Sequence, residues 1–216
     1  MSTSASTQRT DRGPTHSRLA LACVAVLSAG VALPLAADTD LPACKADVGP
    51  RNSKVKIDNV TLEKTTIDEI FKTFGKARET YSKVEECCMA RDVCYLSPDQ
   101  RLAVEFGGWK RLNITSYNVT NDADEIKTYK NCVVSPRLAR PIENSIGLTL
   151  GMSKSEVVKR LGTPKRKFST RDDEIEYYFQ CHPANLGEGW ARITYILIRF
   201  KDDKATLIRL SQDTQG

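Results

Sequence analysis

An internal repeat constrains the fold of this chain more than any other feature of its sequence. Residues 66–75 and residues 153–162 share one pattern, 87 positions apart (162 − 75 = 87). In both copies a Thr or Ser precedes a Glu by three residues, apolar residues follow, and a glycine comes directly after the last of them. Such a pattern predicts a capping box that opens a short helix and a glycine that ends it. We therefore expect two copies of one helix-containing unit.

The copies also match further along the chain. Residues 106–110 align with residues 200–204 at an offset of 94 (200 − 106 = 94), so the second copy has seven extra residues (94 − 87 = 7). Residues 183–189 are rich in Pro, Asn and Gly, a composition typical of loops. We expect the extra residues there, between two strands.

Runs rich in β-branched and aromatic residues follow each predicted helix. They cover residues 92–96, 102–106 and 111–117 in the first copy, and residues 174–180, 192–200 and 205–210 in the second. Turn signals separate the runs: residues 97–99, Gly107-Gly108 and Asp202-Asp203. The prediction is an α+β fold of two tandem modules, each a short capped helix packed on an antiparallel three-stranded meander. Its parts are residues 1–37, a first module at 38–132, a linker at 133–146 and a second module at 147–216.

Alternation along these runs predicts two sheet faces. The inner face carries Ile196, Ile198, Phe200, Leu102, Val104, Phe106, Ile208 and Ile114 and packs on the helices. The outer face carries Tyr178, Tyr195, Leu197, Arg199, Leu207 and Arg209, with Glu105, Asn113, Thr115 and Tyr117 in the first copy. Tyr and Arg are typical of protein-binding hot spots. Our candidate partner-binding residues are thus Tyr178, Tyr195, Arg199, Arg209 and Tyr117; the alternative is that the other module or the linker covers this face.

Residues 1–37 are typical of a secretory signal peptide. Arg9, Arg12 and Arg18 precede an apolar and small-residue run at 19–37, and polar residues follow. The run is long enough to span a bilayer, so a retained N-terminal anchor is the alternative. Lipidation at Cys44 is disfavoured because Leu41-Pro42-Ala43 lies beyond the apolar run. We expect an exported protein, periplasmic or secreted.

The net charge of the chain gives little information about its partners. Without residues 1–37 the chain has 29 basic and 26 acidic residues (32 − 3 and 27 − 1), a net charge of about +3. A balance this mild does not require a nucleic-acid partner, and none is predicted.

Six cysteines remain after residue 37, an even number that suits an oxidising compartment. They are Cys44, Cys87, Cys88, Cys94, Cys132 and Cys181. Six cysteines allow fifteen pairings, which the sequence does not resolve. Cys94 and Cys181 are 87 residues apart (181 − 94 = 87), so each is expected to cross-link its own module. A metal site is disfavoured, because His182 is the sole histidine beyond residue 37 and adjacent cysteines do not have zinc-ligand spacing.

The second helix and its flanks carry a family resemblance. Residues 151–164, Gly-Met-Ser-Lys-Ser-Glu-Val-Val-Lys-Arg-Leu-Gly-Thr-Pro, with Tyr177-Tyr178 and residues 198–204, resemble the small module shared by outer-membrane assembly lipoproteins and the β-lactamase inhibitory proteins. The first copy departs from it, with Glu63-Lys64 in place of Gly-Met and Lys76-Ala77 in place of x-Pro. Tandem duplication, export and cysteine content are similar to the inhibitor branch. The resemblance implies a concave sheet that grips another protein, and it transfers no particular target.

Chemistry for an enzyme is scarce in this sequence, and no cofactor is predicted. A nucleophile–histidine pair would have to use His182, and its neighbour Cys181 points to the opposite face of a strand. The carboxylates at 172–174 and at Asp122, Asp124 and Glu125 lie in turn-like stretches. No glycine-rich phosphate loop occurs.

A basic patch follows the second helix. It comprises Lys165, Arg166, Lys167 and Arg171, preceded by Lys159 and Arg160. It would suit an acidic protein or an anionic envelope surface; the alternative is compensation of the helix dipole by a solvated loop. Asn59, Asn113 and Asn118 begin glycosylation sequons, which matter in a eukaryotic source.

These observations predict an exported, non-catalytic protein that binds another protein through its sheet face, in the manner of an inhibitor. An envelope-assembly or surface scaffold is the alternative, and an unrecognised hydrolase comes third.

Overall fold

The computed structural model describes residues 54–85, 88–108, 113–164, 173–183 and 185–216. The chain divides into two units, Met1–Ala36 and Ala37–Gly216, and every described residue belongs to the second. None of the helices within the described residues is long and apolar enough to span a bilayer.

Two short helices begin and end as their sequences predict. Helices α1 (Ile67–Phe74) and α3 (Lys154–Leu161) each have a complete capping box, Thr66 with Glu69 and Ser153 with Glu156. Gly75 and Gly162 end them at φ of 96° and 84°, a backbone conformation that favours glycine. The predicted N-caps and stops are confirmed.

The predicted fold class is wrong, because most of the regular structure belongs to one eight-stranded sheet. Its order is β3-β4-β5-β6-β10-β9-β8, all antiparallel, with β7 parallel to β4. The strands are β3 (Thr80–Glu85), β4 (Cys88–Leu96), β5 (Ala103–Gly108), β6 (Ser116–Thr120), β7 (Val133–Val134), β8 (Glu174–Cys181), β9 (Ala191–Lys201) and β10 (Lys204–Gln215). The remaining elements are β1 (Lys56–Ile57), β2 (Val60–Thr61), α2 (Ala123–Ile126) and the 3-10 helix η2 (Pro136–Ala139).

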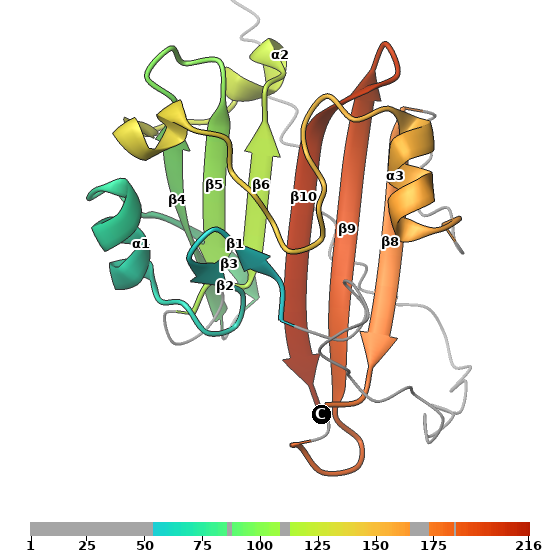
Figure 1. Cartoon of the computed structure of the whole chain (residues 1–216). Coiled ribbons are helices and arrows are strands. Elements are labelled where there is room, and N and C mark those ends of the chain that lie inside the picture. The colour runs from blue at the N-terminus through green and yellow to red at the C-terminus, as the bar shows by residue number, and fades with distance from the viewer. Residues whose placement is uncertain (1–53, 86–87, 109–112, 165–172, 184) are drawn as a thin grey trace, which may run out of the picture. The chain divides into compact units, whose positions relative to one another are not determined.

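The two halves join at β6 and β10, which pair from Leu207–Thr120 to Ser211–Ser116. A separate meander would leave an edge strand with unpaired backbone N–H and C=O groups. Pairing the last strand of each half removes both of those edges and makes the sheet continuous (Figure 1). This pairing is the physical reason why two separate helix-plus-meander modules do not form.

One face of the sheet carries the core. Helices α1 and α3 and the β1–β2 hairpin lie on this face (Figure 1), and their apolar residues pack with the inward residues of both halves. Ile70, Phe74, Val157 and Leu161 are buried there as predicted. Leu138 and Ile146, from the segment between the halves, are buried in the same core. The connecting segment thus contributes to the helix-bearing face.

Backbone and side-chain contacts show which repeat positions are equivalent. The N–H groups of Ile114 and Ala205 donate to the carbonyls of Thr65 and Met152, each at 2.8 Å, just before the two helices. The hydroxyls of Tyr95 and Tyr177 donate to the carbonyls of Gly75 and Gly162, at 2.8 and 2.9 Å.

Tyr95 and Tyr177 are therefore equivalent, with an offset of 82 (177 − 95 = 82) instead of 87. Cys94 and Cys181 then do not correspond, and the predicted equivalence is wrong. Cys94 does form a disulfide, with Cys132, and Cys181 is also disulfide-bonded. The side chains of Cys44, Cys87 and Cys88 lie outside the described residues.

Strand bounds match the sequence prediction best in the second half. The Asp202–Asp203 turn between β9 and β10 is confirmed, and both residues have positive φ. The residues from Pro183 to Gly189 do connect β8 to β9. Gly107 and Gly108, predicted as a turn, lie within β5 instead. Strand β3 was not predicted from the sequence.

Candidate binding face

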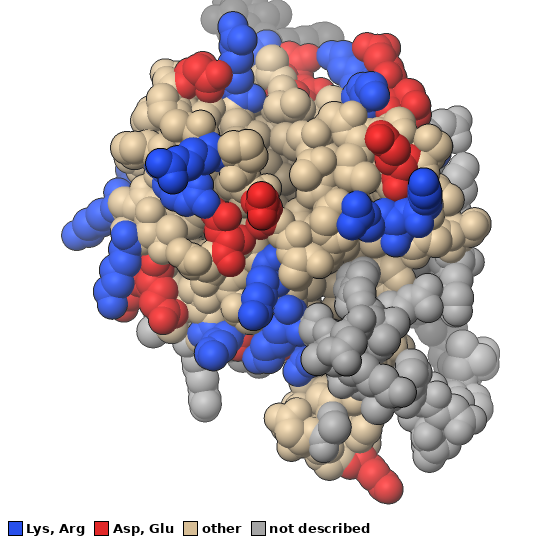
Figure 2. All heavy atoms as spheres, viewed as in Figure 1, with Lys and Arg blue, Asp and Glu red and all other residues tan. Residues whose placement is uncertain are grey.

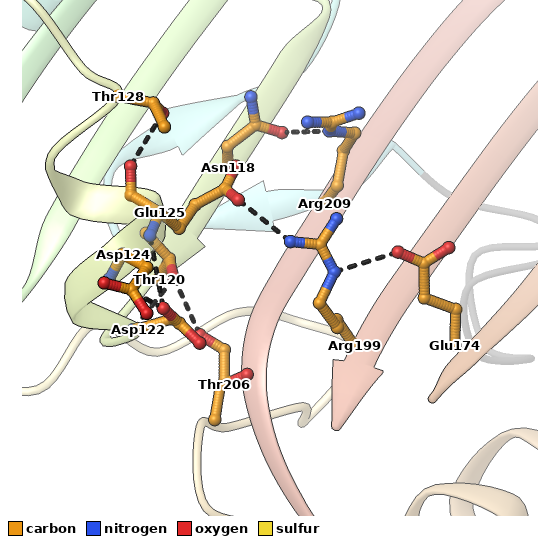
Figure 3. Close-up of polar contacts among 10 residues, drawn as sticks. All are labelled: Asn118, Thr120, Asp122, Asp124, Glu125, Thr128, Glu174, Arg199, Thr206 and Arg209. Carbon is orange, nitrogen blue, oxygen red and sulfur yellow. Dashed lines mark hydrogen bonds and ion pairs between the residues drawn. The ribbon is translucent and has the colours of Figure 1, made fainter. Parts of the chain in front are cut away.

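The sheet face opposite α1 and α3, here called the outer face, carries a polar network instead of a core. The helix-bearing side shows Lys, Arg, Asp and Glu interspersed over its described residues (Figure 2). On the outer face, in contrast, charged side chains occupy neighbouring strands at the same level and bind one another (Figure 3). This face is the strongest candidate for a functional surface.

The network has a row that crosses the junction between the halves. Glu105, Asn118 and Arg209 lie directly opposite one another on β5, β6 and β10. Arg209 Nε donates to Asn118 Oδ1 at 2.9 Å, and Asn118 Nδ2 donates to Glu105 Oε2 at 2.8 Å. The row therefore connects the first half to the second through side chains as well as through the backbone.

A second set of contacts centres on Arg199 of β9. Its Nε donates to Glu174 Oε1 and its Nη1 donates to Glu125 Oε2, both at 2.9 Å. Glu174 is its cross-strand neighbour on β8, and Glu125 comes from α2 in the other half. Both arms of the guanidinium are thus held in place, as Figure 3 shows.

Burial changes the proton affinities of this face. Burial raises the pKa of Glu105, although the Asn118 hydrogen bond and Arg209 oppose the rise. Burial also raises the pKa of Glu176, opposed by a hydrogen bond with Tyr195 and reinforced by the charge of Glu174. Burial lowers the pKa of Arg199, but its bonds to Glu174 and Glu125 outweigh that effect and raise it overall. The ion pairs keep Arg199 charged in a partly desolvated setting.

Four of the five predicted partner-binding residues lie on the outer face. Tyr178 is 45% exposed. Tyr195, Arg199 and Arg209 are half-buried, so these side chains are less exposed to solvent than the prediction implied. The prediction for Tyr117 is wrong: it is 1% exposed and packs on Phe106 in the core. Its strand register differs from the predicted one, because β6 begins at Ser116 and runs to Thr120.

Sequence reasoning missed three members of the network. Asn118 was noted only as a sequon, and Glu125 only as a solvated loop charge. Glu174 begins β8, where the predicted run at 174–180 also begins, but its carboxylate was assigned to a turn-like acidic stretch, whereas it is 7% exposed and binds Arg199. Glu174 begins a predicted strand, and Arg199 is an outward residue of the next predicted strand. An acid and a base in such positions are the signal that could have predicted their ion pair. The basic patch Lys165, Arg166, Lys167 and Arg171 lies outside the described residues.

Among the described residues, His182 and its neighbour Cys181 do not form a catalytic pair. His182 is away from the network, with its Nδ1 2.8 Å from the carbonyl oxygen of Trp190. Cys181, its neighbour, is in a disulfide and supplies no thiolate. Among the described residues, no three His, Cys, Asp or Glu side chains are grouped to hold a metal ion. The arrangement holds hydrogen-bond donors and acceptors in fixed positions on the outer face.

Comparisons with protein-family models, with curated proteins and with solved structures found no match to this chain. The resemblance drawn from residues 151–164 therefore stays a prediction.

Proposed function

We propose that this is an exported, non-catalytic protein that binds another protein through the outer face of its sheet. The observation that carries this proposal is the pre-set geometry of Arg199 and Arg209, which lie on neighbouring strands and are each held by side-chain hydrogen bonds at 2.9 Å. Arginine and tyrosine side chains dominate binding hot spots. Side chains that are already ordered lose less conformational entropy when a partner binds.

The exposed ring of Tyr178 extends this surface toward the edge of the sheet. Tyr178 lies opposite Tyr195, which lies opposite Ser211. A partner would meet tyrosine and arginine side chains together, and both residue types are enriched in protein interfaces. The disulfide at Cys94 and the bonded Cys181 are consistent with an oxidising compartment.

Capture of a partner from the envelope fraction and culture medium of the producing cell tests the proposal. Tyr178→Ala should weaken capture by roughly 2 kcal/mol, about thirtyfold, if Tyr178 is a hot spot. Tyr81→Ala is the matched control, because Tyr81 is 57% exposed but lies on the other edge strand, β3. Equal loss in both variants, or capture that neither variant weakens, would reject the outer face as the binding surface.

A further inference from the structure

The segment from Asn121 to Cys132, here called the strap, lies over the outer face. Glu125 from the strap binds Arg199, and Cys132 is bonded to Cys94, which is the cross-strand neighbour of Glu105. Tyr129 is near enough to Glu105 and Glu125 that their charges add to the effect of burial in raising the pKa of its phenol. The strap thus binds Arg199 and lies near Glu105, the first member of the Glu105–Asn118–Arg209 row.

The strap is held by few contacts. None of its residues is fully buried, and the half-buried ones are Asp122, Glu125, Ile126, Tyr129 and Cys132. A solvent-open hollow lined by Arg101, Asn121, Ala123, Ile126 and Lys127, with Gln100, lies beside α2. Segments with little buried apolar surface open at low free-energy cost. By contrast, the start of the strap is fixed, because Asn121 N–H and Thr120 Oγ1 both donate to the carbonyl of Thr206, at 3.0 and 2.9 Å.

We propose that the strap is a movable cover of the outer face, latched by the Glu125–Arg199 ion pair at 2.9 Å and tethered at its far end by the Cys94–Cys132 disulfide. This inference rests on the proposed function, since it makes the strap a regulator of that same surface. Lifting α2 frees one arm of Arg199 and uncovers the row that crosses the junction. A partner that reaches this centre must first displace Glu125.

Hydrogen–deuterium exchange of the whole protein tests the latch without any partner. The reporters are the amides of Ile126, Thr128 and Tyr129, which donate within the strap. Glu125→Gln should speed their exchange about threefold to fivefold, as expected for loss of one partly exposed ion pair. Asp124→Asn is the matched control, because Asp124 is the neighbouring acid and pairs only with the exposed Lys127 in the described contacts. Amides of Ile196 and Ile208 in the central strands should not change.

The tether is tested by a Cys94→Ser/Cys132→Ser double variant, in which strap exchange should rise by tenfold or more. Nitration of Tyr129 should accelerate in the same variant relative to Tyr178. The cover is rejected if Glu125→Gln behaves like Asp124→Asn, or if strap and central strands exchange faster together. Should the double variant fail to fold, Glu125→Gln alone decides.

Capture experiments separate this inference from the proposed function. Faster strap exchange with stronger capture by Glu125→Gln supports both. Faster exchange with capture equal to that of the parent rejects the covering role and leaves the binding function. If neither form captures a partner, the proposed function fails, and with it the regulatory role of the strap.

Discussion

Single residues on the outer face show how burial and close approach act together. The carboxylate of Asp92 reaches over Gly107: a Cβ at Gly107 would lie 2.4 Å from Asp92 Oδ1 and 2.4 Å from Ser116 Oγ. A side chain at position 107 would fit only if the side chains of Asp92 and Ser116 moved aside. Burial, with a smaller contribution from the charge of Glu105, raises the pKa of Asp92 to about 6.

Asp92→Asn is expected to stabilise the protein at pH 7.5 and to have little effect near pH 4. The folded pKa of about 6 exceeds the ordinary aspartate value of 3.8, so the folded state binds a proton first as pH falls. The ionised carboxyl thus costs stability above pH 6, and the cost disappears between about pH 6 and pH 4. The full shift corresponds to about 3 kcal/mol, which partial solvation reduces to roughly 1–2 kcal/mol.

Urea unfolding at several pH values measures this difference. Asp213→Asn is the control, since Asp213 is on β10 of the same sheet but exposed. A stabilisation of the same size at pH 4 and pH 7.5, or one shared by Asp213→Asn, would contradict the effect of burial.

Arg199 gives a second prediction at this scale. Arg199→Ala should destabilise the protein by about 2–3 kcal/mol, because it removes the ion pair that Arg199 makes with Glu174, which is 7% exposed. The Arg199→Met/Glu174→Met pair should recover part of the loss, since it also removes the buried carboxylate of Glu174, while Glu125 still loses its bond from Arg199. Thermal or chemical unfolding provides the values. Lys127→Ala, in an exposed pair, should leave stability nearly unchanged; a similar loss there would argue against desolvation as the cause.

At the scale of elements, the feature that the two halves share is a capping box at the start of a short helix. Each capping box satisfies backbone N–H groups that an eight-residue helix would otherwise leave unpaired. The hydrogen bonds that Thr66 and Ser153 donate to Glu69 and Glu156 lower the pKa of both carboxyls. The stabilisation that these carboxylates provide is therefore present at neutral pH and is lost as pH falls through their folded pKa values.

Removing either cap should weaken the protein by a similar amount. Thr66→Ala and Ser153→Ala are each expected to cost on the order of 1 kcal/mol in free energy of unfolding. Thr73→Ala is a suitable control, because Thr73 is inside α1 and its hydroxyl donates to the carbonyl of Glu69 in the same helix; alanine favours a helix at that position. The N-cap assignment would be contradicted if Thr66→Ala and Ser153→Ala left the free energy of unfolding unchanged while Thr73→Ala lowered it.

At the scale of the whole sheet, the junction between β6 and β10 makes the two halves one folding unit. Buried residues from both halves, such as Ile70 and Val157, belong to the same core. The outer-face row continues across the same junction. Neither half keeps its edge paired without the other.

We expect a single cooperative unfolding transition. Ile70→Ala, in α1, and Val157→Ala, in α3, should each lower the melting temperature of the whole protein, with a cost of about 2–4 kcal/mol for Ile70→Ala and somewhat less for the smaller Val157. Differential scanning calorimetry with all disulfides intact measures this. Two separate transitions, each sensitive to only one of the variants, would show that the halves fold independently.

Local features of the fold could be predicted from the sequence because short-range chemistry decides them. Thr66, Ser153, Gly75 and Gly162 act within one turn of their own helix, and the alternation around Ile196 and Ile198 assigns the inner face. Register could not be predicted in the same way. A shift of one residue reverses the direction of every side chain in a strand, which is why Tyr117 was placed on the wrong face.

The sequence by itself thus determined two capped helices, their stops, most strands and many of the residues that face the core. Only the tertiary structure decided that β6 pairs with β10, that Cys94 bonds Cys132, and that Glu125 and Glu174 meet at Arg199. These contacts join residues far apart in the chain, and their partners are selected by the pairing of strand edges and the path of the strap. No local pattern contains that information, because the free energy of each contact depends on what the rest of the fold brings beside it.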